Sequence, residues 1–333
     1  MSQYNVIIIC GGGSNEHEIS LISASYIQSQ LAKFSNVNTI KVILDKSGNF
    51  IGESGQSVTF NNQQQLINAQ QNEFTKVDFV IPCIHGFPGE TGDLQSFLTL
   101  HNLPFLGSDA EASIHCFNKV TAKQWFTALG IPNTPYLFLT EYSDESVRQV
   151  KEALNNWGSV FIKATNQGSS VGCYKVDSKE EIKEKLQLAF NYSSYVLVEK
   201  TINARELEVA AYEYDGETVI TQPGEIICDK NTFYDFDEKY SAESKANTDV
   251  VAKNLDSKTL SKIAEYSAKA FKGMKLRHLS RIDFFLTDDN QILLNEINTF
   301  PGMTPISMFP QMLINNGHDF GEFLIKIIKQ QAK

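Results

Sequence analysis

The stretch VIIICGGGSNEHEIS (residues 6–20) determines the fold at the start of the chain. Its apolar residues Val6–Cys10 predict a buried strand, and the three glycines that follow predict a tight turn. A helical pattern then runs from about Ile19 to Phe34. Ligands gather at the C-terminal ends of strands in α/β sheets, so the polar residues after Cys10 are candidates for a binding site.

Beyond this stretch, strand-like and helix-like segments alternate, which predicts an open and largely parallel sheet. A glutamine- and asparagine-rich segment, residues 61–72, contains Leu66 and Ile67 and is predicted to be a surface helix or loop. A second unit begins near Asn118 and a third contains a polar stretch from Asp229 to Asn254. The expected later strands are Val160–Lys163, Cys173–Val176, Tyr195–Glu199, Glu206–Tyr214, Arg281–Leu286 and Ile292–Ile297.

The bulk composition limits the class of protein. A chain of 333 residues is too long for one compact core and predicts two or three domains. The net charge of -10 argues against a nucleic-acid partner. The five cysteines form no C-x-x-C pair, and no apolar run is long enough to cross a bilayer or serve as a signal segment. We therefore expect a soluble, cytoplasmic protein with reduced thiols and no membrane partner.

The first motif with chemical meaning is KATNQGSSVG, residues 163–172. Glycines and small hydroxyl residues let backbone N–H groups approach phosphate oxygens, and Lys163 adds a positive charge. The loop connects one predicted strand to another, so it is not a Walker or Rossmann loop, which would lead into a helix. A hairpin that folds over a nucleotide and a plain flexible hairpin are equally compatible with this stretch.

The second motif combines Arg281 and Asp283 on one predicted strand with Glu296 and Asn298 on the next. Side chains alternate across a strand, so each pair shares a face. Together the two strands would present three hard oxygen ligands, which suit Mg²⁺. A solvated strand face is the weaker interpretation, because these polar residues interrupt otherwise apolar runs.

Three further features are ambiguous by themselves. The loop from Asn298 to Met308 holds two prolines and a glycine, and it fits either a rigid source of backbone donors or an ordinary turn. Glu16 either binds an ammonium group or favours a helix N-terminus electrostatically. His85 follows a strand end, where a lone histidine is more often structural than catalytic.

Taken together, the motifs resemble the D-alanine–D-alanine ligases of the ATP-grasp superfamily, over essentially the whole chain. The similar segments are GGGSNEHEIS, HGFPGETG, CFNK, KATNQGSSVG, VEK, FYDFDEKY, SRIDFFL and NEINTFPGMTPIS. The resemblance implies an α/β ATP-grasp architecture, with an N-terminal open parallel sheet domain (1–117) and two α+β domains that clamp ATP (118–212 and 213–333). It also implies a homodimer and two Mg²⁺ ions, for which Mn²⁺ can substitute.

The resemblance further implies roles for individual residues at the nucleotide and metal end. Phosphates would be held by Lys119, Lys163, Lys239 and the hairpin at Ser169 and Ser170. The adenosine would be bound by Glu199, Lys200, Ile202 and Glu206. The metal ligands would be Asp283, Glu296 and Asn298.

At the D-alanine end, the implied groups surround the two amino acids. Glu16 would bind the first ammonium, in a network with Ser169 and Tyr240 and with His85 nearby. Arg281 and the Gly302 N–H would stabilise an oxyanion, and Ser307 with Met308 would hold the second carboxylate. The implied reaction passes through a D-alanyl phosphate, protected by a mobile loop around FYDFDEKY. The product would serve peptidoglycan synthesis.

Relatives that make D-alanyl-D-lactate typically have a histidine where this sequence has Tyr240, so the tyrosine favours D-alanine as the second substrate. Three alternatives stay open at this level. They are a ligase for another D-amino acid, D-lactate or a different amine; a nucleotide-binding regulatory module; and a non-catalytic scaffold. The last two are disfavoured because Arg281, Asp283 and Glu296 are all present.

Overall fold

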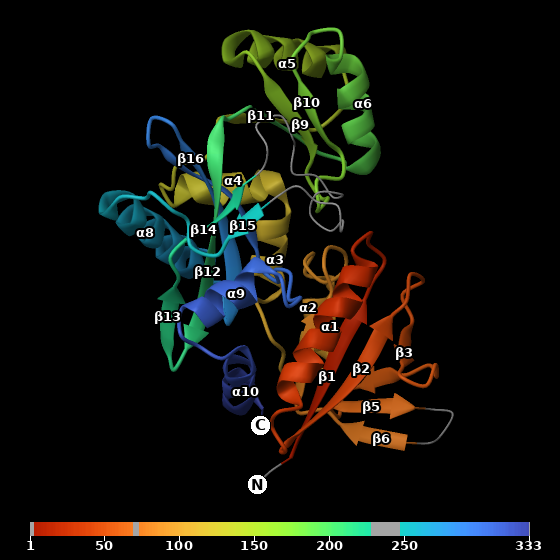
Figure 1. Cartoon of the computed structure of the whole chain (residues 1–333). Helices are drawn as coiled ribbons and strands as arrows, with labels where there is room; N and C mark the ends of the chain where they lie inside the picture. Colours follow the sequence, from red (N-terminus) through yellow and green to blue (C-terminus); the bar gives the residue numbers. More distant parts are fainter. Residues whose placement is uncertain (1–2, 69–72, 228–246, 333) are drawn as a thin grey trace.

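The computed structural model describes residues 3–68, 73–227 and 247–332. Its N-terminal sheet, in red and orange in Figure 1, has the strand order β3-β2-β1-β7. The strands β2 (Val37–Leu44) and β7 (Phe79–Cys83) both pair in parallel with β1 (Tyr4–Gly11), and β3 (Phe50–Gly52) is an antiparallel edge. The predicted open and largely parallel sheet is confirmed.

The two faces of β1 are buried in different cores. Val6 and Ile8 pack in a cluster with helix α1 (His17–Leu31) and with the C-terminal helix α10 (Phe320–Gln331). Ile7 and Ile9 pack on the opposite side, with helix α2 (Asp93–Leu100). Burial on both faces explains the unbroken apolar run of this strand. The end of the chain thus packs against its beginning, as Figure 1 also shows.

The prediction for residues 61–72 is wrong where the structure describes them. β4 (Thr59–Asn61), β5 (Gln65–Asn68) and β6 (Glu73–Lys76) form a small antiparallel sheet. The amide groups that suggested a loop or a helix instead brace the turn, because Asn61 Nδ2 donates to Gln65 Oε1 at 2.9 Å. Phe60 and Leu66 are buried beneath the strands. Residues 69–72 lie outside the described residues.

A second sheet, green in Figure 1, has the order β10-β9-β11-β8 and is antiparallel throughout. Its strands are β8 (Tyr136–Leu139), β9 (Val160–Ala164), β10 (Cys173–Val176) and β11 (Val196–Lys200). Since Cys173 pairs with Lys163, the predicted hairpin around residues 164–172 is confirmed. Helices α5 (Asp144–Trp157) and α6 (Ile182–Tyr192) pack against this sheet.

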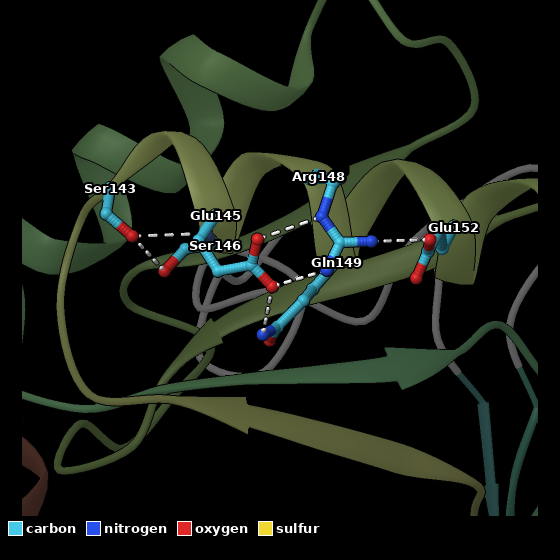
Figure 2. A network of polar contacts seen from close by, with 6 residues as sticks. All are labelled: Ser143, Glu145, Ser146, Arg148, Gln149 and Glu152. Atoms are coloured by element: carbon cyan, nitrogen blue, oxygen red, sulfur yellow. Dashed lines mark hydrogen bonds and ion pairs between the residues drawn. The ribbon is translucent and has the colours of Figure 1, made fainter.

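Helix α5 shows how the surface of this unit is stabilised (Figure 2). Ser143 caps its N-terminus by accepting from the backbone N–H of Ser146, and Arg148 bridges Glu145 and Glu152. Hydrogen bonds from Arg148 and Gln149 lower the pKa of Glu145 to about 2. Because these groups are exposed, the ion pairs contribute little stability, and the amphipathic packing of the helix holds it in place.

The third sheet carries the central strands of the molecule, in the order β15-β14-β12-β16-β17, with β13 also paired to β12. Its strands are β12 (Ala204–Tyr214), β13 (Glu217–Ile220), β14 (Gly224–Ile227), β15 (Asn247–Asp249), β16 (Leu279–Thr287) and β17 (Ile292–Asn298). The register of β16 and β17 shifts between Asp283 and Phe284: Asp283 pairs with Glu296, whereas Phe284 pairs with Leu294. Asn295 is therefore the extra residue of a β-bulge.

The remaining helices surround this sheet: α3 (Ala110–Phe117), α4 (Lys119–Ala128), α8 (Ser257–Gly273) and α9 (Met308–Asn315). Helices α4 and α8 share a core with β12, β16 and β17, whereas α9 packs with α1 and α10. Gly107, near the boundary of the first two predicted domains, is hydrogen-bonded to the residues that directly precede β16 in the third sheet. Gly107 donates its N–H to His278 Nδ1 at 3.0 Å, and Arg277 Nε donates to the Gly107 carbonyl at 2.8 Å.

Several sequence-based expectations are not tested by this architecture. The division at residues 117 and 212 stays a prediction, although β12 lies in the same sheet as β16. The predicted mobile loop, with Lys239 and Tyr240, lies outside the described residues, as does Cys228. The other four cysteines are unpaired thiols. Among the described residues, no helix has the length and apolarity needed to cross a membrane.

Candidate active site

Lys119, Lys123 and Lys163 lie beside the sheet of strands β8 to β11. Lys119 begins α4, and its Nζ donates to the carbonyl of Gln167 at 2.7 Å. Lys123 lies one turn later on the same helix, and Lys163 lies on β9. The Nζ atoms of Lys123 and Lys163 contact the two carboxylate oxygens of Glu199 at 2.5 and 2.6 Å.

Glu199 is 3% exposed on β11, so its charge needs compensation. Burial by itself would raise its pKa, but the charges of Lys123 and Lys163 and their hydrogen bonds lower it to about 2. The carboxylate is therefore ionised at neutral pH. A fixed anion of this kind can accept hydrogen bonds from an amino group that enters the site.

The loop between β9 and β10 connects this cluster to the N-terminal sheet. Ser169 and Ser170 both have positive φ, 48° and 61°, an unusual conformation for residues other than glycine. The Ser169 hydroxyl donates to Glu16 Oε1 at 2.7 Å. The loop therefore reaches the segment that precedes α1, and its folding over a nucleotide stays a prediction.

Glu16 immediately precedes α1, at the end of the glycine turn. It makes no side-chain capping bond to the helix, so any effect on the helix N-terminus is through its charge, and both interpretations of Glu16 stay open. The turn needs glycine at Gly11, where φ is +91° and an added Cβ would lie 2.6 Å from the Leu44 carbonyl oxygen. Gly12 also has positive φ, and its carbonyl contacts His17 Nδ1 at 2.7 Å.

His85 lies beside Glu16 and is buried, which lowers its pKa, so its imidazole is neutral at neutral pH. Its Nε2 contacts Ser23 Oγ at 3.2 Å, and the same hydroxyl accepts from the Met303 N–H at 3.3 Å. Glu90 accepts from the Gly86 N–H at 2.8 Å, and burial together with the charge of Glu16 raises its pKa to about 8. His85 and Glu90 are therefore both neutral around pH 7.

The predicted polar face of β16 and β17 is confirmed as a geometric arrangement. Arg281 pairs with Asn298 and Asp283 with Glu296 across the two strands. Arg281 Nε and Nη2 donate to the two oxygens of Asp283 at 2.8 and 2.7 Å, and Asn298 Nδ2 donates to Asp283 at 3.1 Å. The solvated-face alternative is excluded for Asp283, which is 8% exposed.

Glu208 on β12 completes this cluster, at 3.2 Å from Arg281 Nη2. Burial alone would lower the pKa of Arg281, but the charges of Asp283 and Glu208 raise it, so the guanidinium stays protonated. No group of three or more His, Cys, Asp or Glu side chains within the described ranges gathers as a metal site. The predicted metal set contains only two carboxylates and an amide, and it stays a prediction.

The loop from Asn298 to Met308 joins this cluster to the His85 end. Ser307 Oγ accepts from the Thr304 N–H at 3.0 Å, and an added Cβ on Gly302 would lie 2.9 Å from the same oxygen. Gly302 and Ser307 are therefore adjacent. Met308 is 5% exposed at the start of α9. These contacts agree with the rigid-loop interpretation.

The predicted adenosine residues lie on β11, in the turn after it and near the start of β12. Lys200 follows Glu199 on the strand and is exposed, Ile202 is half-buried in the next turn, and Glu206 is exposed on β12. Lys239 and Tyr240 lie outside the described residues.

Two protein families match the two parts of this chain. The family described as D-ala D-ala ligase N-terminus matches residues 5–108, and the one described as D-ala D-ala ligase C-terminus matches residues 125–329. The chain is 60% identical over 332 residues to the D-alanine–D-alanine ligase of Shewanella sp. (strain MR-7), covering 99% of each protein.

The chain belongs to the D-alanine–D-alanine ligase family.

Solved structures of D-alanine–D-alanine ligases and their relatives agree with the fold. The structure of D-alanyl-alanine synthetase A from Vibrio cholerae has a TM-score of 0.94 at 51% identity, covering 99% of each chain. The VanG D-Ala:D-Ser ligase from Enterococcus faecalis has a TM-score of 0.87 at 28% identity, covering 99% of this chain and all of that one. The predicted α/β ATP-grasp fold is confirmed.

Sequence reasoning missed three residues of this D-alanine–D-alanine ligase site: Lys123, Glu208 and Glu90. Lys123 was detectable, because a position four residues after Lys119 lies on the same face of a helix. Glu208 shares a strand face with Glu206 by alternation, but its contact with Arg281 depends on the pairing of β12 with β16. Glu90 stood within the motif HGFPGETG without any signal of its burial.

Proposed function

We propose that this chain is an ATP-dependent ligase that joins two D-alanine molecules into D-alanyl-D-alanine for peptidoglycan synthesis. The observation that carries the proposal is the contact of Ser169 with Glu16 at 2.7 Å. It links a lysine- and glycine-containing loop to a carboxylate beside His85, in a chain 60% identical to a D-alanine–D-alanine ligase. A phosphate-binding end and an amino-acid-binding end therefore adjoin.

At the nucleotide end, Lys119, Lys163 and the loop at Ser169 and Ser170 hold the phosphates, and Lys239 adds a further charge. Glu199 accepts from the adenine amino group, Lys200 and Ile202 line the base, and Glu206 binds the ribose. The buried, ionised state of Glu199 supports its part in this assignment. The lysines support theirs, because neutralising and positioning phosphate charge is the main task in phosphoryl transfer.

A divalent metal fits the cluster on β16 and β17. Asp283, Glu296 and Asn298 would hold two ions through the hard oxygens that Mg²⁺ and Mn²⁺ prefer. Asn298 currently points its amide nitrogen at Asp283, so a half-turn of the amide presents its oxygen instead. A metal bound there would neutralise charge on the transferring phosphate. Arg281 keeps Asp283 oriented towards its neighbours.

At the amino-acid end, Glu16 holds the ammonium of the first D-alanine, in a network with Ser169 and Tyr240, and neutral His85 lies alongside. The carboxylate oxygen of that D-alanine attacks the γ-phosphorus of ATP and displaces ADP. The amine of the second D-alanine then attacks the carbonyl carbon of the D-alanyl phosphate, and phosphate leaves.

Arg281 and the Gly302 N–H stabilise the oxyanion that forms in this step, an effect worth about 2.7–4 kcal/mol per donor. Ser307, with Met308 beside it, binds the second carboxylate, and the adjacency of Gly302 and Ser307 supports both assignments.

The remaining assignments follow the same family. Residues 1–117 form the substrate domain, and 118–212 and 213–333 form the two domains that clamp ATP. Tyr240 favours D-alanine over D-lactate as the second substrate. The enzyme works in the cytoplasm as a homodimer.

The test is incubation of the purified chain with ATP, Mg²⁺ and D-alanine, with phosphate release and product mass followed together. Parallel reactions offer L-alanine, or D-alanine mixed with D-serine or D-lactate. We expect phosphate release matched by D-alanyl-D-alanine, with little mixed product. Preferential mixed product would contradict the choice of second substrate. No product with any pairing, despite ATP binding, would point to a regulatory module instead.

A further inference from the structure

The buried carboxylate of Glu199 has two lysine partners, and the two differ in their access to the site. The side chain of Lys123 is 2% exposed and that of Lys163 is 16% exposed. Lys163 lies at the start of the loop that reaches Glu16. Lys123 lies on helix α4, and its ammonium group is buried against the Glu199 carboxylate.

The cluster brings two lysines to one carboxylate, and the charge of Glu296 acts on both lysines as well. Lys163 can turn from Glu199 to a phosphate, because it adjoins the loop of residues 164–172. Its departure would leave a buried carboxylate unpaired unless another cation stayed in place. An unpaired buried charge is strongly unfavourable, and the group would then take up a proton. Lys123 meets this requirement because its buried side chain stays against the Glu199 carboxylate.

We propose that Lys123 is a positioning residue that keeps Glu199 ionised and aimed at the nucleobase, and so determines the selectivity of the site for adenine. A carboxylate has about four acceptor positions. Each lysine ammonium lies against one oxygen, at 2.5 and 2.6 Å, and the remaining positions can accept N–H bonds from a 6-amino group. A 6-oxo group, as in hypoxanthine, presents an acceptor to this anion and is repelled.

Loss of the Lys123 charge has two consequences that can be observed. If Glu199 keeps Lys163 as its partner, the phosphates lose a lysine and ATP binds more weakly. If Glu199 takes up a proton instead, it can donate a hydrogen bond to a 6-oxo group. ITP, which carries a hypoxanthine base, is then no longer repelled. The inference predicts the second outcome, in which the preference for ATP over ITP declines; in the first, both nucleotides lose the same phosphate contact and the preference is unchanged. This inference rests on the adenine role of Glu199 in the proposed function.

The experiment is calorimetric titration of ATP and ITP into the full chain with Mg²⁺ and without D-alanine. We compare the wild type with Lys123→Met and with Lys123→Arg, which retains the charge. Lys269→Met, an exposed lysine on α8, is the matched control. We expect the wild type and Lys269→Met to prefer ATP by tenfold or more. Lys123→Met should bind ATP about tenfold more weakly and prefer it by less than threefold, and Lys123→Arg should recover part of both.

A lower melting temperature for Lys123→Met with an unchanged ATP preference would reduce Lys123 to a structural role and overturn the inference. A wild type that binds ATP and ITP equally would overturn the inference and the adenine role of Glu199, but not the ligase proposal. A wild type that binds neither nucleotide would overturn the proposed function itself.

The double variant Lys123→Met/Glu199→Gln covers the case in which Lys123→Met does not fold, because it removes both buried charges. If Lys123 acts through Glu199, the double variant should have the same ATP preference as Glu199→Gln alone. A preference that differs between the two would show that Lys123 acts by another route and would contradict the inference.

Discussion

The hydroxyl of Ser169 donates a hydrogen bond of 2.7 Å to Oε1 of Glu16, a residue 153 positions earlier in the chain. The donor belongs to the loop between β9 and β10, and the acceptor precedes α1. The bond connects the N-terminal sheet with the sheet of β8 to β11, and these two sheets are formed by separate parts of the chain. It therefore holds the loop of residues 164–172 against the segment that precedes α1.

Ser169→Ala should weaken the binding of the first D-alanine without unfolding the protein. A hydrogen bond to a charged group contributes about 1.5–3 kcal/mol, which corresponds to roughly 10- to 100-fold in the D-alanine KM. Steady-state kinetics at saturating ATP measures this change. The exposed Ser194→Ala serves as control, and a D-alanine KM within twofold of wild type for Ser169→Ala would exclude a role for the bond.

Glu208→Gln should reduce turnover while ATP binding stays within twofold. The Glu208 carboxylate lies 3.2 Å from Arg281 Nη2, and Asp283 contacts the same nitrogen. Without the charge of Glu208, the guanidinium should shift towards Asp283. We expect kcat to fall about tenfold, which corresponds to about 1.4 kcal/mol of barrier. Glu217→Gln on the exposed strand β13 should have no effect. Equal turnover in the two variants would refute the positioning of Arg281 by Glu208.

Gly11→Ala should destabilise the chain by about 1–3 kcal/mol, because the new methyl group meets the Leu44 carbonyl at a positive φ. Gly13→Ala is a matched control: it adds the same atom two residues later, where the nearest heavy atom lies 4.0 Å away. Urea unfolding of both variants measures the difference. Similar midpoints for the two would contradict the steric argument.

His278 should make the free energy of unfolding fall as the pH falls below about 6.5. Burial, together with the charge of Arg277, lowers its folded-state pKa from 6.5 to about 3, so between these values the unfolded chain binds more protons. The loss is at most about 1.4 kcal/mol per pH unit. The neutral ring is also the form that accepts from the Gly107 N–H.

Chemical denaturation of His278→Asn between pH 7 and 4 measures this contribution. Asparagine tolerates the positive φ of 63° at this position and does not titrate, so its stability should depend less on pH than that of the wild type. His101→Asn, at the end of α2, controls for the loss of an imidazole. Identical slopes for wild type and His278→Asn would show that His278 does not cause the effect.

Periodicity predicted the parts of the fold in which local pattern and tertiary environment agree. The polar face of Arg281 and Asp283 was predicted because these residues interrupt an otherwise apolar run, and the structure pairs their strand with that of Glu296. The same reasoning failed for residues 61–72, because amide-rich composition conceals strands whose few apolar residues, Phe60 and Leu66, point into a core.

The candidate site was predictable where motif residues are close in sequence and less so where sheet pairing brings them together. Lys163 and Ser169 belong to one motif, whereas the contact between Glu208 and Arg281 arises from the register of β12 and β16. Burial is also invisible in a single sequence. For that reason neither the sealed position of Lys123 nor the raised pKa of Glu90 was foreseen.

The bulge at Asn295 separates two halves of one hairpin that serve different purposes. On one side of it, Asp283 and Glu296 face the site; on the other, Phe284 and Leu294 are packed in the core. Since side chains alternate every residue, the extra residue sets the phase of the polar half independently of the apolar half. Without the bulge, a regular ladder would pair Asn295 with Asp283 and Glu296 with Ile282, and would so turn the Glu296 carboxylate from the site towards the core.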